Sequence, residues 1–175
     1  MRVRSLYTEL ETLNSLSPEQ ANAEFLKCCG SRTWARAMNK ARPFATVAQL
    51  LGTADDVWSS LSNEDWLEAF RAHPKIGEKK AAMAQSEQAQ KWSAQEQERT
   101  QEATAETKAA LAEGNRKYED RFGFIFIICA SGKSAEEILA SLNDRVQNDP
   151  ETELAIASEE QRKITRLRLE KLSKK

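Results

Sequence analysis

The chain has 175 residues, 40% of them hydrophobic and 30% charged, and 26 basic residues nearly balance 27 acidic ones to give a formal net charge of -1. This composition excludes an intrinsically disordered chain, and the length favours one domain with its own hydrophobic core. Only the stretch from Arg162 to Lys175 is locally basic, so we expect no nucleic-acid partner.

The cysteines and the chain start favour a cytoplasmic protein. Cys28, Cys29 and Cys129 are odd in number and form no CxxC pair, which argues against a disulfide framework or a zinc site. The first ten residues lack the apolar run of a secretion signal, and no segment is apolar enough to span a membrane. We therefore expect a cytoplasmic protein without a metal site or a membrane partner.

Helix signals recur along the chain while alternating strand patterns are nearly absent, which predicts an all-α fold. Ser17 and Gln20 form a capping box around an N1 proline and predict a first helix that ends before Gly30. Further helices are predicted over 32–41, 46–51 and 54–61, with Gly52 ending the second of these. A helix capped by Ser62 follows and leads to His73.

In the second half, Ser93 and Glu96 form another capping box, which predicts a helix running from there toward Leu111 and on to Arg121. The apolar run 122–129 is predicted to be a buried extended segment or a helix start, because one strand alone cannot form a sheet. Ser134 and Pro150 begin the last two predicted helices. Together these signals predict a single-domain multi-helix bundle over residues 1–175, with 1–15 and 172–175 frayed.

His73 is the only histidine in the chain and stands where a helix pattern meets Pro74 and then Gly77. Proline disfavours the α conformation at the residue before it and cannot continue a helix, so the imidazole is expected to project from a stiff corner. Its pKa near physiological pH suits a proton donor or acceptor. A lone histidine is also often structural, so the residue by itself leaves both roles open.

Three segments resemble the marker segments of one family. They are His-Pro-Lys-Ile-Gly at 73–77, Trp-Ser-Ala-Gln-Glu-Gln at 92–97 and Phe-Gly-Phe-Ile-Phe-Ile-Ile-Cys at 122–129, and they resemble 2-oxo-4-hydroxy-4-carboxy-5-ureidoimidazoline (OHCU) decarboxylase. Segments 41–44 and 164–169 are similar to further family segments in the same order, so the resemblance covers nearly the whole chain. The family run usually has a proline where this chain has Ile125.

The resemblance implies an all-helical enzyme, commonly a homodimer, that converts OHCU to (S)-allantoin and carbon dioxide in urate breakdown without a metal or cofactor. By position, His73 would be the catalytic histidine and Glu96 its acidic partner. Pro74 would shape the pocket and Arg168 would hold a carboxylate or carbonyl, although Arg166 on another face of the same helix is the alternative. The other residues that the resemblance places at the substrate are Ser93, Ala94, Gln95 and Gln97, and the backbone of Phe126, Ile127, Ile128, Cys129 and Ala130.

The chemistry of these residue types agrees with that assignment. Decarboxylation beside an imine-like group leaves an electron pair that the substrate itself can delocalise, so no cofactor is expected. Glu96 beside His73 is expected to raise the imidazole pKa and favour a proton donor near neutral pH. Two alternatives remain open: a hydrolase or isomerase of another ureido or purine-derived compound, and a non-catalytic helical interaction module in which these segments are only caps and core.

Overall fold

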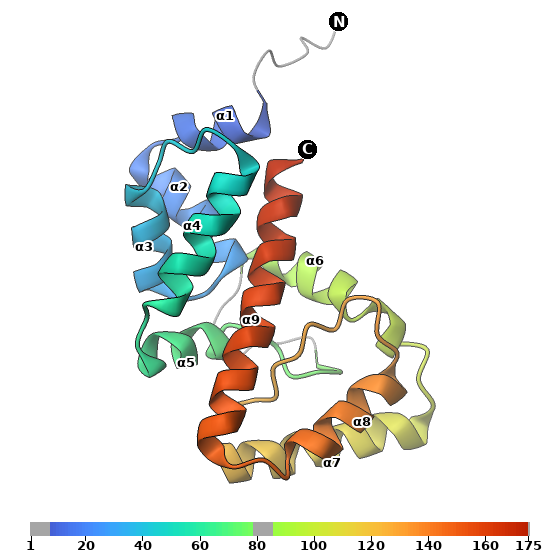
Figure 1. The fold of residues 1–175 in the computed structure, drawn as a ribbon. Coiled ribbons are helices and arrows are strands. Elements are labelled where there is room, and N and C mark those ends of the chain that lie inside the picture. Colours follow the sequence, from blue (N-terminus) through green and yellow to red (C-terminus); the bar gives the residue numbers. More distant parts are fainter. Residues whose placement is uncertain (1–7, 79–85, 175) are drawn as a thin grey trace, which may run out of the picture.

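The computed structural model describes residues 8–78 and 86–174, and within these ranges the chain forms nine α-helices and no β-strand, as predicted. Figure 1 shows the arrangement. The helices are α1 (Glu9–Ser15), α2 (Pro18–Cys28), α3 (Arg32–Lys40), α4 (Val47–Ser59), α5 (Asn63–Arg71), α6 (Glu87–Glu96), α7 (Ala105–Phe122), α8 (Ala135–Arg145) and α9 (Pro150–Ser173), with a short 3₁₀ helix, η1 (Glu98–Thr100), after α6.

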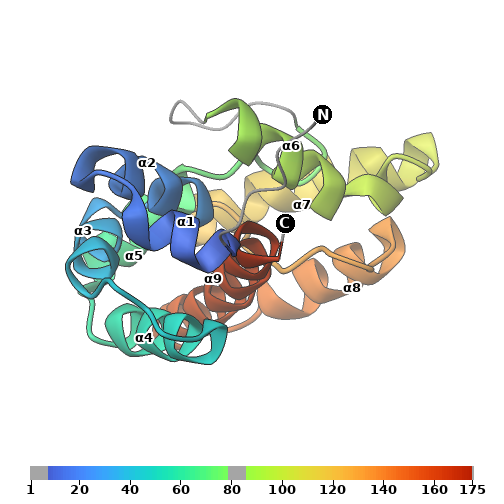
Figure 2. The same cartoon turned by 90° about the horizontal axis from the view of Figure 1, so that it is seen from above.

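Helix α9 is the central element of the fold. In Figure 1 it lies between the group α1–α5 and the group α6–α8, and Figure 2 shows α3 and α4 on one side of it and α8 on the other. It contacts α1, α2, α4 and α5 directly. Its 24 residues make it about 36 Å long at 1.5 Å per residue, long enough to pass both groups. Several of its buried side chains are polar, among them Gln161, Thr165 and Arg168. One helix therefore supplies both core packing and buried polar groups.

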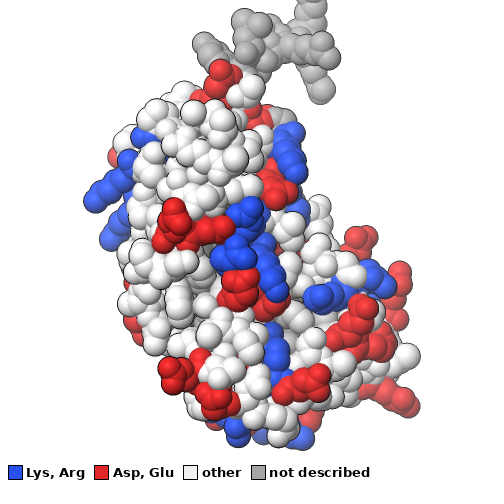
Figure 3. Space-filling view, in the orientation of Figure 1, with Lys and Arg blue, Asp and Glu red and all other residues white. Residues whose placement is uncertain are grey.

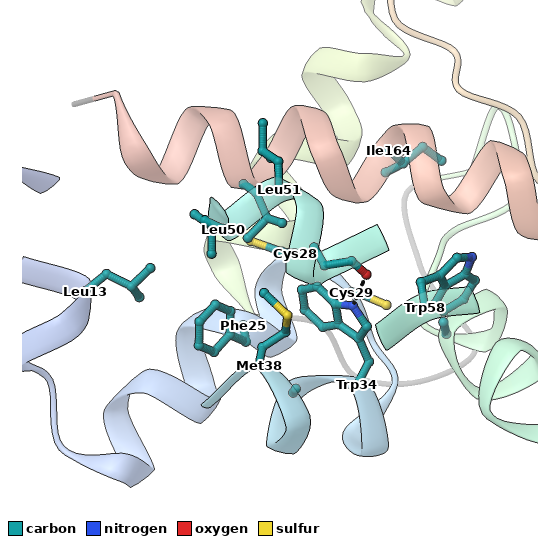
Figure 4. Packing of buried hydrophobic residues seen from close by; sticks show 14 of the residues in the cluster. Leu13, Phe25, Cys28, Cys29, Trp34, Met38, Leu50, Leu51, Trp58 and Ile164 are labelled. Atoms are coloured by element: carbon teal, nitrogen blue, oxygen red, sulfur yellow. Dashed lines mark hydrogen bonds between the residues drawn. The ribbon is translucent and has the colours of Figure 1, made fainter. Parts of the chain in front are cut away.

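The larger hydrophobic core fills the space between α2, α3, α4, α5 and α9 (Figure 4). Trp34 is fully buried at its centre, packs edge-on against Phe25 with ring centroids 6.0 Å apart, and donates from its indole nitrogen to the carbonyl of Ala54 at 3.2 Å. Trp58 is buried at the α4–α9 contact, where its indole donates to the Ser158 carbonyl. The tryptophans thus serve packing, as their helical spacing suggests.

A second core lies between α7, α8 and the segment that joins them. Its buried members are Ile76, Leu111, Tyr118, Phe126, Ile128, Ala130, Ala135, Ile138 and Leu142. Helices α7 and α8 approach closely at Gly114, where an added Cβ would lie 2.5 Å from Leu142 Cδ2. The two cores meet at the segment after α7, whose residues contribute to both of them.

Several predicted helix starts are confirmed, and others are wrong. Capping boxes begin α2, α5 and α8 at Ser17, Ser62 and Ser134. Helix α4, however, continues through Gly52 instead of ending there, because packing of its apolar face offsets the roughly 1 kcal/mol cost of an interior glycine.

The prediction that a helix begins at Ser93 is also wrong. Ser86 caps α6, which ends at Glu96, and Thr104 caps α7. At the chain start, the expected fraying of 1–15 is corrected for Thr8 to Ser15: Thr8 caps α1, whose Leu10 and Leu13 are buried. At the other end, α9 extends to Ser173. Residues 1–7 and 175 lie outside the described residues.

The surface carries charges of both signs close together. On the face seen in Figure 3, basic and acidic side chains are interspersed and form no broad field of one sign. Near the middle of α9, Arg162 and Arg166 both bind the Asp55 carboxylate, at 3.2 and 2.6 Å. No helix in the described parts of the chain is both long and apolar enough to cross a bilayer.

Candidate functional site

His73 stands at a tight corner after α5. The helix ends at Arg71, the His73 N–H closes a last turn onto the Phe70 carbonyl at 3.1 Å, and Pro74 then turns the chain away. The corner is pressed against the α2–α3 connection, where a Cβ added to Gly30 would lie 2.3 Å from Ala72 Cβ. His73 is 8% exposed, so its ring is held inside the protein rather than on the surface.

The imidazole is anchored to α9 through Gln161. His73 Nε2 lies 2.6 Å from Gln161 Oε1, and Gln161 is completely buried. The other end of the same amide donates from Nε2 to Thr165 Oγ1 at 3.1 Å. Gln161 and Thr165 are one helical turn apart and face the same way, so α9 fixes the orientation of the histidine ring.

Arg168 lies one further turn along α9 and forms a two-pronged ion pair with Glu96. Its Nε and Nη2 donate to the two carboxylate oxygens of Glu96, both at 2.9 Å, and Nη2 also donates to Ser93 Oγ at 3.1 Å. Nη1 donates to the carbonyl of Lys27 at 3.3 Å. The side chains are 3% and 9% exposed, so this is a buried pair with the fork geometry of the strongest charge-assisted bonds.

These surroundings keep His73 neutral at pH 7. Burial and the positive charge of Arg168 lower the pKa of the imidazole from 6.5 to about 4, outweighing the upward pull of Glu96 and of the Gln161 hydrogen bond. The expected upward effect of Glu96 on this pKa is confirmed, but it does not set the net pKa, so the expectation of a proton donor near neutral pH is wrong for this structure. The Glu96 carboxylate raises the His73 pKa, but Arg168, which is bound to Glu96, lowers it by more.

The segment after α7 is extended, which is one of the two forms predicted for it, the other being a helix start. Gly123 ends α7 in the left-handed conformation at φ 77° and donates back to Glu119, after which residues 124–130 form no helix. Two side chains hold its backbone: the Cys129 N–H donates to Glu160 Oε2 at 2.7 Å, and the Ile127 carbonyl accepts from Arg145 Nη1 at 2.8 Å.

A small pocket of about 20 Å³ opens beside His73. It brings together most of the predicted site residues, namely His73, Pro74, Ser93, Glu96, Gln97, Phe126, Ile127, Ile128 and Ala130, with Ile76 and Ile164. An adjoining pocket of about 750 Å³ shares Pro74, Ile76, Ser93 and Gln97 with it and is also lined by Ala94. The larger volume is typical of small-molecule sites, whereas the smaller has room for about one water molecule.

The remaining predicted site residues lie outside both pocket linings. Gln95 is exposed, and Cys129 is half-buried with a pKa raised by burial. Arg168 lies behind the pocket, bonded to Ser93 and Glu96, whereas Arg166 faces Asp55 on another side of α9. Within residues 8–78 and 86–174, no three His, Cys, Asp or Glu side chains lie close enough to hold a metal ion.

Sequence reasoning missed the residues that support the site. Gln161 and Thr165 hold His73, Glu160 holds the extended segment, and Asn115 donates to the Ile76 carbonyl at 3.1 Å. A signal for the first two was present. Gln161, Thr165 and Arg168 follow each other at spacings of four and three, which places three polar side chains on one stripe of a helix.

Comparison with known proteins gives one consistent family. The family model described as OHCU decarboxylase matches residues 14–170. The chain is 40% identical over 158 residues to the uric acid degradation bifunctional protein TTL of Arabidopsis thaliana, covering 90% of this chain and 48% of that protein. It is 31% identical to the 2-oxo-4-hydroxy-4-carboxy-5-ureidoimidazoline decarboxylase of Amia calva over 170 residues, which cover 93% of each protein.

A solved structure agrees in fold and sequence. A crystal structure of OHCU decarboxylase in the presence of (S)-allantoin has a TM-score of 0.75 and 41% identity to this chain, covering 86% of this chain and 96% of that one. The chain thus spans about half the length of the bifunctional plant relative, but nearly the full length of the Amia calva protein.

Proposed function

Because the chain belongs to the OHCU decarboxylase family, we propose that it decarboxylates 2-oxo-4-hydroxy-4-carboxy-5-ureidoimidazoline to (S)-allantoin and carbon dioxide. One observation carries the proposal beyond family membership. A buried neutral imidazole, His73, and a buried carboxylate, Glu96, line one pocket together with the extended segment at 126–130. Such a combination suits proton transfer at a flat, hydrogen-bonding heterocycle.

The proposed reaction has two parts. The bond to the carboxylate breaks, carbon dioxide leaves, and the electron pair moves into the ring toward the neighbouring imine nitrogen, which takes up a proton. The ring hydroxyl then gives up its proton while the adjacent ring carbon receives one. The imine group of the substrate is the electron sink in these steps, so the proposal requires neither a metal nor an organic cofactor.

His73 is proposed as the general acid/base of the second part. A neutral ring accepts the hydroxyl proton, and the resulting imidazolium can return a proton to carbon. The nearby Glu96 carboxylate would stabilise the transient imidazolium, since opposite charges favour the charged form. This assigns Glu96 to the charged intermediate rather than to a protonated resting enzyme.

Arg168 is proposed chiefly to position Glu96 and Ser93. A guanidinium has five N–H groups, and Glu96, Ser93 and Lys27 occupy four of them in the described structure. One N–H on Nη1 remains for a substrate carbonyl or carboxylate. Ser93 and Gln97 line both pockets and are proposed, with the peptide groups of 126–130, to bind the polar edges of the substrate.

We further propose that residues 1–175 form a single domain that acts as a homodimer in the cytoplasm. Support for the homodimer comes from the family resemblance, and support for the cytoplasm comes from three cysteines without a disulfide pattern. Sedimentation equilibrium of the purified chain measures the assembly directly. A mass of twice 19.7 kDa supports the dimer, and a mass of 19.7 kDa overturns it.

Circular dichroism of freshly generated OHCU tests the proposed reaction. OHCU is produced in situ from urate, and the appearance of optically active allantoin is followed with the wild type, with His73→Ala and with no added protein. We expect fast formation of the optically active product with the wild type alone. If the wild type does not outpace the spontaneous background while folded, the decarboxylase proposal fails, and binding or another ureido substrate becomes the question.

A further inference from the structure

We propose that Gln161, itself oriented by Thr165, is a positioning residue that fixes neutral His73 as the tautomer with its proton on Nε2, leaving Nδ1 as the proton-accepting atom. The inference rests on the proposed function for the role of Nδ1 but not for the tautomer. Gln161 and Thr165 lie outside the family segments at 73–77, 92–97 and 122–129, so the resemblance gives them no role.

The first step concerns the amide of Gln161. An amide oxygen only accepts hydrogen bonds, so the ring nitrogen 2.6 Å from Gln161 Oε1 must carry a proton. Nε2 is therefore the N–H of the neutral ring. Gln161 is completely buried, so water cannot replace this acceptor.

The second step concerns the orientation of that amide, since a rotated amide would place its NH₂ group against the histidine and reverse the tautomer. In the structure Gln161 Nε2 donates to Thr165 Oγ1 at 3.1 Å. This bond turns the other end of the amide, Oε1, toward His73.

The third step concerns the other ring nitrogen. Across residues 8–78 and 86–174, no hydrogen bond is formed by His73 Nδ1. His73 lines the pocket shared with Ser93 and Glu96, and Nδ1 is the ring nitrogen that does not bind Gln161. The hydrogen-bonded chain Thr165–Gln161–His73 thus sets which ring nitrogen is the base.

The single histidine makes the test unusually direct. In tag-free protein with ¹⁵N-labelled histidine, the only imidazole signals come from His73, and long-range ¹H–¹⁵N spectra identify which nitrogen is protonated. At pH 7 we expect the wild type to show protonated Nε2 and unprotonated Nδ1. Thr165→Ser, which keeps the hydroxyl, should preserve this pattern, whereas Gln161→Met should give a mixture of both tautomers.

The activity measurement is separate from the spectrum. We expect Gln161→Met to lose about 10- to 100-fold in kcat, the range seen when partners that orient a metal-binding histidine are removed. Gln161→Glu places a carboxylate at the same distance, so it should raise the His73 pKa and move the acidic limb of the pH profile to higher pH. Ser158 is a buried α9 residue whose hydroxyl bonds only to the Ala155 carbonyl in its own turn, so Ser158→Ala is the matched control for the helix.

The outcomes separate the positioning role of Gln161 from the proposed decarboxylase activity. If folded Gln161→Met retains the wild-type tautomer, and Gln161→Glu leaves the titration of His73 unchanged, the positioning role is overturned whether or not the wild type decarboxylates OHCU. If the spectra change as expected but the wild type has no decarboxylase activity, the tautomer assignment stands and the proposed function fails. If Ser158→Ala alters the tautomer as much as Gln161→Met, the effect belongs to α9 packing and the inference is overturned.

Discussion

Glu96 and Arg168 are both withdrawn from solvent, so each depends on the other to compensate its charge. Removing one partner of a buried pair leaves the other uncompensated, which costs about 3–5 kcal/mol. We expect Glu96→Ala to lower the free energy of unfolding by about this amount and to abolish turnover. Urea unfolding measures the first effect, with exposed Glu98→Ala as the control within about 0.5 kcal/mol of the wild type. Equal stability of the two variants would show that the pair carries no such dependence.

The low pKa of His73 also predicts how stability changes with pH. Burial, with Arg168 nearby, lowers this pKa from 6.5 to about 4, so the unfolded chain binds more protons than the folded one between these values. The stabilising contribution of the neutral ring is thus complete above about pH 6.5 and is lost as the pH falls toward 4, by up to about 3 kcal/mol.

His73→Asn, which does not titrate, isolates that contribution. The other titratable groups are common to the two proteins, so their contributions cancel in the difference. Between pH 7 and pH 4, we expect the wild type to lose more unfolding free energy in urea than His73→Asn does. Parallel pH profiles of the two proteins would contradict a buried neutral histidine.

Sequence alone predicted the chemical groups of the site better than their roles. His73, Ser93 and Glu96 were found through the family segments, and they do meet at one pocket. The net pKa of His73 was not predictable, because it depends on how deeply the ring is buried and on the distance to Arg168. Gln161 has no motif of its own, and only the fold brings it to a histidine 88 positions away.

At the scale of elements, the corner that carries His73 depends on how closely α5 approaches the α2–α3 connection. An added Cβ at Gly30 would lie 2.3 Å from Ala72 Cβ, which is too close unless one of the two segments moves. We expect Gly30→Ala to cost about 1–3 kcal/mol of stability and to reduce turnover by displacing His73. The double variant Gly30→Ala/Ala72→Gly returns the space and should recover most of both losses; no recovery would mean that steric contact with Ala72 is not the cause.

Gly52 makes the opposite prediction. It lies inside α4, and a Cβ built there meets nothing within 4 Å. Because alanine restricts the unfolded chain and favours the helix, Gly52→Ala should raise the unfolding free energy by about 0.5–1 kcal/mol with no change in activity. Thermal unfolding followed at 222 nm by circular dichroism measures this, and a lower melting temperature would contradict it.

Helix starts were predictable where the side chain of the capping residue bonds only to its own helix. Ser17, Ser62 and Ser134 cap helices as expected, since their hydroxyls bond nearby backbone N–H groups. Ser93 has the same local pattern, yet its hydroxyl binds Arg168, 75 positions later. A pattern of four residues cannot distinguish a cap from a distant partner, and this is why the start of α6 was misplaced.

For the whole molecule, a buried carboxylate joins α9 to α7 and α8, beside the apolar core that α7 and α8 share. Glu153 on α9 is completely buried and accepts from the Tyr118 hydroxyl at 2.5 Å, from Arg145 Nε at 2.8 Å and from Asn148 at 3.0 Å. Arg145 also holds the Ile127 carbonyl and lies 4.4 Å from the centre of the Phe126 ring. The fold class was predictable from helix periodicity, but this joint was not, because its members come from three separate helices and the α8–α9 connection.

This arrangement predicts that stability and the site are linked through Glu153. Glu153→Ala should cost about 3–5 kcal/mol and also reduce turnover, because Arg145, deprived of its partner, no longer holds the backbone at Ile127. Tyr118→Phe removes one bond to a charged group, so it should cost less, about 1.5–3 kcal/mol.

A double-mutant cycle in urea tests the link. If Glu153 and Arg145 act as one unit, Glu153→Ala and Arg145→Ala together should cost less than the sum of the single variants, by about 0.5–3 kcal/mol. Glu113→Ala, which breaks a half-exposed pair with Arg116, is the control and should stay within about 1 kcal/mol of the wild type. If the losses of unfolding free energy are instead additive, Glu153 does not hold the pocket segment through Arg145. Folded Glu153→Ala protein should then keep its turnover.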